Sequence, residues 1–139
     1  MSNELSLASL MLPSKTVEME FPGYDGFTVS LCFLAREELI KLRKKCTSTK
    51  FNRNSHKPED TLDEEKFVKE YCKSVIKGWT GFKVKYLEEL LLVNTEGLDP
   101  ETELPSTEDN ILNLMRNCEA FESWVQQGVT SLENFTKSK

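Results

Sequence analysis

The sequence lacks the residue patterns on which most enzymes and metal proteins depend. It has one histidine, His56, in a polar segment, so catalysis with an imidazole base would rest on that side chain alone. Its glycines never fall into the spacing of a phosphate-binding loop. Its cysteines show no Cys-x-x-Cys spacing, which argues against a zinc site. We therefore expect a protein that is not an enzyme and that binds no metal and no cofactor.

Long apolar runs are also missing. No stretch approaches the ~20 apolar residues that a membrane-spanning helix needs, and the first residues lack the basic segment of a signal peptide. The mean hydropathy is -0.46. We expect a cytoplasmic protein that does not contact membranes and whose cysteines are buried free thiols. These cysteines are Cys32, Cys46, Cys72 and Cys118.

Charge is distributed unevenly along the chain, whose net charge is -5. Residues 36–85 carry fourteen basic and eight acidic side chains, whereas residues 86–139 carry three and eleven. The split suits internal complementarity or contact between copies, although solvated helix faces also explain it. The basic run Arg43–Lys45 could contact nucleic acid, but no aromatic residue interleaves it. A helix C-terminus, where basic side chains are favoured, is the simpler explanation.

The pattern of apolar residues predicts one domain of mixed structure. Residues 1–14 predict a mobile arm whose leucines could dock on a second copy. Residues 15–34 alternate on both sides of a turn and predict a β-hairpin, and residues 35–135 keep mostly helical spacing. Residues 15–135 would form the globular domain, and residues 136–139 would fray. The expected fold class is α+β, mainly α, with an N-terminal β-hairpin followed by a bundle of about four to five helices.

Several local signals divide the helical region. A capping box at Thr61–Glu64 predicts the start of a helix that ends at Trp79, next to two glycines. The polar segment 47–58 reads as an exposed loop, and residues 82–93 favour helix over strand. A second capping box at Ser106–Asp109 predicts the last helical segment. Because a tryptophan in an apolar stripe usually belongs to the core, we expect Trp79 to pack on the C-terminal aromatic residues.

The last sixty residues have a recognisable order of motifs. An Ile-x-x-Trp-x-Gly segment precedes a loop, a Leu-Pro with helix-capping residues, a leucine-rich helix and an aromatic helix. This order resembles the tail assembly chaperones of long-tailed bacteriophages, over residues 76–135. The matching positions are Ile76, Trp79, Gly81, Leu104, Pro105, Asp109, Asn110, Phe121, Leu132 and Phe135, and the adjacent Trp124 joins them as a structural motif residue.

The resemblance implies a non-enzymatic protein of the host cytoplasm that binds the tape measure protein. It would keep the long helices of that protein soluble and would help to recruit tail tube subunits. Residues 82–93 and 111–135 contain leucine, methionine and aromatic residues that could grip a helix if exposed. Two alternatives remain open, a small nucleic-acid-binding regulator that uses the basic residues 36–85 and an adaptor or inhibitor of a host protein.

Overall fold

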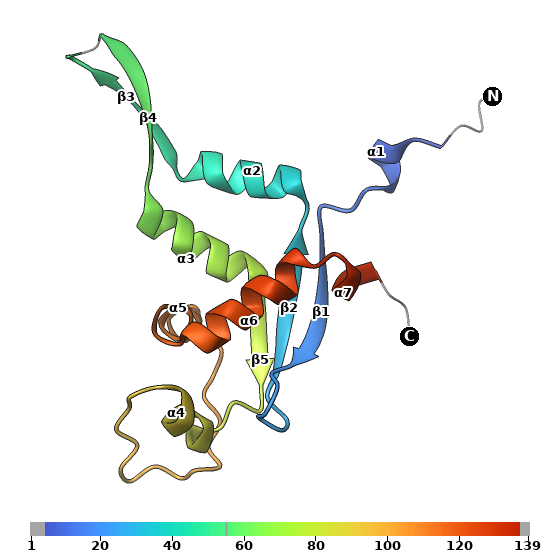
Figure 1. Ribbon diagram of the computed structural model, residues 1–139, viewed down its shortest axis with the longest axis vertical. Helices are drawn as coiled ribbons and strands as arrows, with labels where there is room; N and C mark the ends of the chain where they lie inside the picture. The colour runs from blue at the N-terminus through green and yellow to red at the C-terminus, as the bar shows by residue number, and fades with distance from the viewer. Residues whose placement is uncertain (1–4, 55, 137–139) are drawn as a thin grey trace.

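The structure is a computed structural model that describes residues 5–54 and 56–136 (Figure 1). Within these residues the chain forms seven helices, a three-stranded sheet and a two-stranded sheet. The expected fold class, a β-hairpin followed by a bundle of about four to five helices, is therefore wrong. The elements in chain order are α1 (Leu7–Leu10), β1 (Ser14–Glu20), β2 (Thr28–Leu34), α2 (Arg36–Lys45), β3 (Thr47–Asn52), β4 (Lys57–Leu62), α3 (Glu64–Val75), β5 (Ile76–Thr80), α4 (Val84–Leu90), α5 (Glu108–Asn117), α6 (Glu119–Thr130) and α7 (Glu133–Thr136).

The three-stranded sheet has the order β1–β2–β5, with both pairs antiparallel. Strand β5 occupies Ile76–Thr80, which we had expected to be the end of a helix. The helix instead stops at Val75 and the chain continues directly into the strand. Glycine and β-branched residues weaken a helix in this segment, and β2 offers a free edge for hydrogen bonding. Pairing with β2 therefore overrides the helical periodicity of the apolar residues.

The second sheet is a hairpin of β3 and β4, in the segment expected to be a loop. It pairs in register from Thr47 with Leu62 to Asn52 with Lys57. No strand signal marks this segment in the sequence, because the hairpin has no apolar face and Phe51, near the middle of the segment, is exposed. The hairpin and the α4 region project from opposite ends of the molecule in Figure 1.

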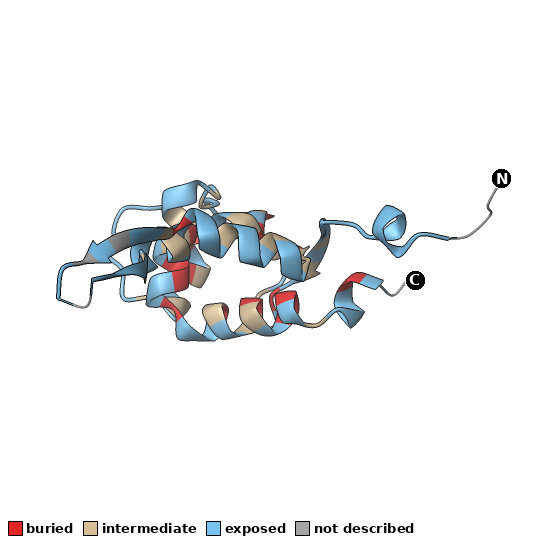
Figure 2. Cartoon of the chain, turned by 90° about the horizontal axis from the view of Figure 1, so that it is seen from above, coloured by how far each residue is buried: buried red, intermediate tan, exposed pale blue. Residues whose placement is uncertain are grey.

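The first element of the described residues is a short helix, which precedes the β1–β2 hairpin. Helix α1 precedes β1, and its leucines and those beside it are exposed, with an exposed fraction of 85% at Leu5. Figure 2 shows this arm extending away from the body. Residues 1–4 of the expected arm and residues 137–139 of the expected frayed tail lie outside the described residues, and Thr136 is the last residue of α7.

The core lies between the three-stranded sheet and the helices. Helices α3 and α6 both pack on β2, and helix α5 packs on α3 and on α6. Phe27 stacks on Phe82 with ring centroids 4.2 Å apart and on Phe121 at 6.0 Å, so one aromatic column links the turn before β2, the turn after β5 and α6. Buried residues lie on the inner sides of the helices in Figure 2. Burial of these aromatic and aliphatic side chains is the main stabilising contribution to the fold.

Helices α3 and α5 begin later than the predicted capping boxes indicate, α3 by two residues and α5 by one. The Asp63 side chain caps α3 by accepting from the Lys66 N–H at 3.1 Å. The Thr107 hydroxyl caps α5 by accepting from the Asn110 N–H at 3.1 Å. Aspartate and threonine both satisfy the free N–H groups of a first helical turn, so either neighbouring residue can take the cap.

Candidate partner-binding groove

The motif residues around Trp79 are structural and hold β5 against the rest of the domain. Trp79 is 7% exposed, and its indole N–H donates to the carbonyl oxygen of Leu104 at 2.8 Å. Its ring meets Phe27, Phe82 and Phe121 edge to face. These contacts fix the long loop before α5 to the sheet, so this part of the motif builds the fold and offers no open surface.

Gly81 begins the turn that follows β5. Its φ is +73°, and its N–H donates to the Glu103 carboxylate at 2.6 Å. Ile76 at the start of the strand is 1% exposed. At the far side of the same loop, the Pro105 carbonyl accepts from the Asn110 side chain at 2.9 Å. These positions therefore join the Trp79 group in shaping the loop connection.

The C-terminal motif residues begin in the Trp79 group, because the Phe121 ring contacts both Trp79 and Trp124. Trp124 meets Phe21 edge to face at 5.0 Å, and Phe135 packs on Phe33 at 5.4 Å. Leu132 is 55% exposed between α6 and α7. The Trp79 group therefore extends through Phe121 to Trp124, whereas Leu132 and Phe135 lie near the end of the chain.

The surface that we expected to grip a partner is mostly internal. Phe82, Val84 and Leu87 are buried in the first of the two expected segments, where Leu92 and Val93 are exposed. In the second segment the large apolar residues of α5 and α6 point into the core. The residues concerned are Ile111, Leu114, Met115, Phe121, Val125 and Val129. A partner surface must therefore be sought on other elements.

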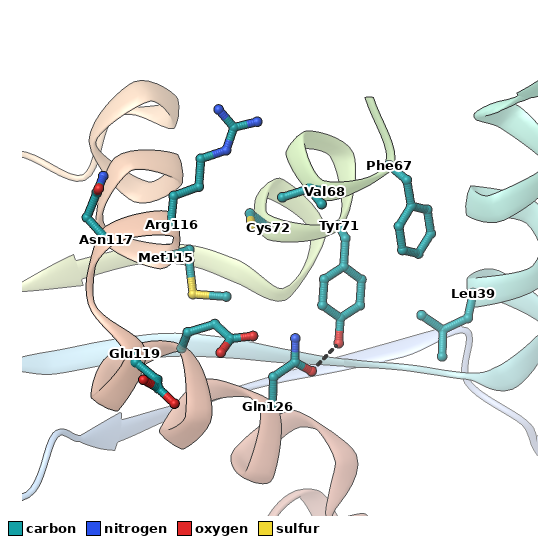
Figure 3. Close-up of a pocket in the computed structure, with 11 residues that line it drawn as sticks. Leu39, Phe67, Val68, Tyr71, Cys72, Met115, Arg116, Asn117, Glu119 and Gln126 are labelled. Carbon is teal, nitrogen blue, oxygen red and sulfur yellow. Dashed lines mark hydrogen bonds between the residues drawn. The ribbon is translucent and has the colours of Figure 1, made fainter. Parts of the chain in front are cut away.

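An open groove of about 860 Å³ lies between α3 and α6, with α5 and α2 at its ends (Figure 3). Its apolar lining comes mainly from α3, where Phe67, Val68 and Tyr71 follow one another along one side. Val68 is 38% exposed, and Leu39 of α2, which also lines the groove, is 37% exposed. The polar lining comes from α5 and α6. It consists of Arg116, Asn117, Glu119, Glu122 and Gln126.

The packing of the flanking helices explains why this groove exists. Helix α3 runs straight into β5, which fixes its end to the sheet. Helix α6 approaches the sheet closely at Gly128, where a Cβ atom would lie 3.0 Å from Leu31 Cδ1. The two helices are thus held to the sheet, and α5 joins them at one end only. The side chains on their facing sides do not fill the space between them and leave a channel.

The groove continues into a second hollow of about 220 Å³. Leu39 and Tyr71 line both hollows, and Val75 and Val129 extend the apolar surface toward β2. Arg36 of α2 stands at this end. Two adjoining hollows with shared walls form one elongated apolar surface, which is the shape that receives an extended or helical segment.

One hydrogen bond crosses the groove. The Tyr71 hydroxyl of α3 donates to the Gln126 side-chain oxygen of α6 at 3.0 Å, and Figure 3 shows the two side chains pointing toward one another. Burial raises the pKa of the Tyr71 phenol above its ordinary value of 10.0, so this donor is protonated at neutral pH, as an unperturbed tyrosine also is. Burial also raises the pKa of the Cys72 thiol in the groove floor. The lining is therefore uncharged in its centre.

Charged side chains lie at the rims. Glu119 and Glu122 stand on α6, and Arg116 stands on α5, on the opposite side of Met115 from Glu119 in Figure 3. The Arg43 guanidinium of α2 lies 5.9 Å from the centre of the Phe67 ring. Across residues 5–54 and 56–136, none of these four side chains takes part in an ion pair. Their charges are available to a bound partner.

Several basic side chains of residues 36–85 are already paired with carboxylates. Lys45 lies 3.5 Å from Glu70, and Lys73 lies 3.4 Å from Glu108. Lys83 and Lys85 both contact Glu101 at 3.1 Å. These contacts lower the pKa of the Glu101 carboxyl, chiefly through the hydrogen bond from Lys85. Pairing of this kind reduces the positive field that a phosphate backbone would meet.

The described part of the chain contains neither a candidate metal-binding cluster nor a candidate membrane-spanning helix. No group of three or more His, Cys, Asp or Glu side chains there is arranged to hold a metal ion. All four cysteines are buried free thiols. No helix among these residues combines the length and the apolar character that crossing a bilayer requires. Comparisons of the chain with protein-family models, with curated proteins and with solved structures found no match.

Proposed function

We propose that this protein is a non-enzymatic assembly chaperone that binds a helical partner in the groove between α3 and α6. The observation that carries the proposal is the elongated apolar surface with free charges at its rims. A helix with one apolar stripe buries that stripe in such a groove and leaves its polar face in water. The sequence resemblance supplies the identity of the partner, a tape measure protein of a long-tailed phage, and a role in recruiting tail tube subunits in the host cytoplasm.

Groove variants test this function. Leu39→Asp places a charge on the wall shared by both hollows, and we expect it to weaken capture of a co-expressed tape measure protein about tenfold or more, because an apolar contact is replaced by a desolvated carboxylate. Ile40→Asp is the matched control, since Ile40 is the next residue on α2, is 44% exposed and lines neither hollow. Equal capture by the two folded variants in a quantitative pull-down would exclude the groove as the binding site.

Self-association is a second part of the proposal. The arm of residues 5–12 exposes a set of large apolar side chains, which a chain in water tends to cover. We expect removal of residues 1–12 to lower the sedimentation coefficient of the protein at micromolar concentration. A truncated chain that stays folded and sediments as the same oligomer would exclude a role for the arm. The apolar residues concerned are Leu5, Leu7, Leu10, Met11 and Leu12.

A further inference from the structure

The α6 side of the groove carries negative charge, whereas positive charge lies toward the two ends of the groove. Glu119 and Glu122 are three residues apart on α6, so both face the groove from the same side. Arg116 at the end of α5 and Arg43 of α2, above the Phe67 ring, supply positive charge away from the α6 side. The Cys72 thiol in the floor is influenced by both, because Arg116 lowers its pKa and Glu122 raises it.

We propose that the groove selects an amphipathic helix whose apolar stripe has basic residues along one edge and acidic residues along the other, and that these edges set the direction of the helix. The basic edge would lie along α6 and the acidic edge would face Arg43 and Arg116. Turning such a helix end for end exchanges its two edges, so its acidic edge would then lie along Glu119 and Glu122. Like charges across an interface disfavour the wrong arrangement. This inference rests on the proposed binding of a helical partner.

A second copy of the chain fits this groove less well. The exposed apolar arm, residues 5–12, carries no charged side chain, so it can meet neither rim. The free rim charges would lose part of their hydration without gaining a partner, which opposes binding. A helix with charged edges covers the same apolar wall, and its charged side chains also pair with the charged side chains at the rims of the groove. Charge complementarity therefore favours a partner helix with two unlike edges.

Three synthetic helical peptides with the same leucine stripe test the selection. The first has lysine on one edge and glutamate on the other, the second has lysine on both edges, and the third has glutamate on both. We expect the first to bind about three- to tenfold more tightly than the others at low salt, since each exposed ion pair contributes modestly. The preference should shrink at high salt. Equal affinities by isothermal titration calorimetry would overturn the charge selection but not helix binding.

Variants of the rim make the test specific. E119K/E122K makes the α6 side basic, as the ends of the groove already are, so the peptide with two glutamate edges should become the tightest binder. Because lysine in the first turn of α6 opposes the helix dipole, E119Q/E122Q is the second variant, for which the lysine–glutamate peptide should lose its advantage over the glutamate peptide. The control variant is E18K/E20K, on the exposed side of β1, which changes the net charge of the protein as much as E119K/E122K does. With this variant the three peptides should keep their original order of affinities.

A nitroxide label at the N-terminus of the lysine–glutamate peptide reports direction. Met115 lines the first hollow and Val129 the second, so their methyl NMR signals mark different ends of the groove. We expect broadening at one of these methyls, and broadening at the other when the lysine and glutamate edges are exchanged. Broadening that stays at one end would overturn the directional part. If none of the three peptides binds, the proposed function itself is overturned. The same conclusion follows if the free protein forms oligomers and E119Q/E122Q dissociates them, because a second copy of the chain would then occupy the groove.

Discussion

Trp79→Ala is expected to lower the free energy of unfolding by about 3–5 kcal/mol, the usual cost of removing a large buried aromatic side chain. Trp79 is almost fully buried, and its ring contacts three other aromatic rings in the core. Alanine would leave a cavity between β5 and α6 and would free the Leu104 carbonyl oxygen. Urea denaturation followed by circular dichroism measures the change.

Two further substitutions separate the contribution of the indole hydrogen bond from that of burying the aromatic ring. Trp79→Phe keeps an aromatic ring but removes the indole N–H, so we expect a smaller loss that includes about 1 kcal/mol for the hydrogen bond to Leu104. Phe51→Ala at the exposed position in β3 is the control for removing an aromatic side chain, and its effect should stay within about 0.5 kcal/mol. A loss below about 1 kcal/mol for Trp79→Ala would contradict its placement in the core.

Gly81→Ala is expected to destabilise the protein by about 2–5 kcal/mol. The residue has a φ of +73°, which costs about 1–2 kcal/mol for an L-amino acid with a Cβ atom. That Cβ would also lie 2.0 Å from the Gly26 carbonyl oxygen and 2.7 Å from its carbonyl carbon. Both are backbone atoms, so the turn after β5 and the turn between β1 and β2 must separate. Denaturant unfolding of the variant measures the cost.

Gly97→Ala is the matched control for this clash. Gly97 has a similar φ of +82°, but no atom lies within 4 Å of the added Cβ. Its substitution therefore has only the conformational cost of about 1–2 kcal/mol. We expect Gly81→Ala to exceed it by at least about 1 kcal/mol. Equal losses at the two positions would mean that the turns do not approach each other closely in solution.

The sequence determined the local features that depend on near neighbours. Alternation around a turn indicates the strands that form β1 and β2, and the leucine-rich segment 82–93 indicates a helix where α4 occurs. Short polar residues before the helical segments indicate where α3 and α5 begin, to within two residues. Each of these signals rests on side chains within one or two turns of the chain, so no distant contact is needed to interpret them.

Tertiary structure decided where the local signals were ambiguous. Residues 76–80 continue the helical spacing of α3, yet the free edge of β2 draws them into the sheet as β5. The β3–β4 hairpin has no apolar face to reveal it, and backbone pairing alone defines it.

The groove could not be predicted because it depends on the distance between two helices that are far apart in the sequence. In the sequence, Phe67, Val68 and Tyr71 have the spacing of one helix face, and no local signal connects them with Glu119 and Glu122. Helix α3 is fixed by its continuation into β5, and α6 by its close approach to β2 at Gly128. These two attachments to one sheet set the spacing of the helices, and that spacing leaves the apolar stripe open beside the acidic rim.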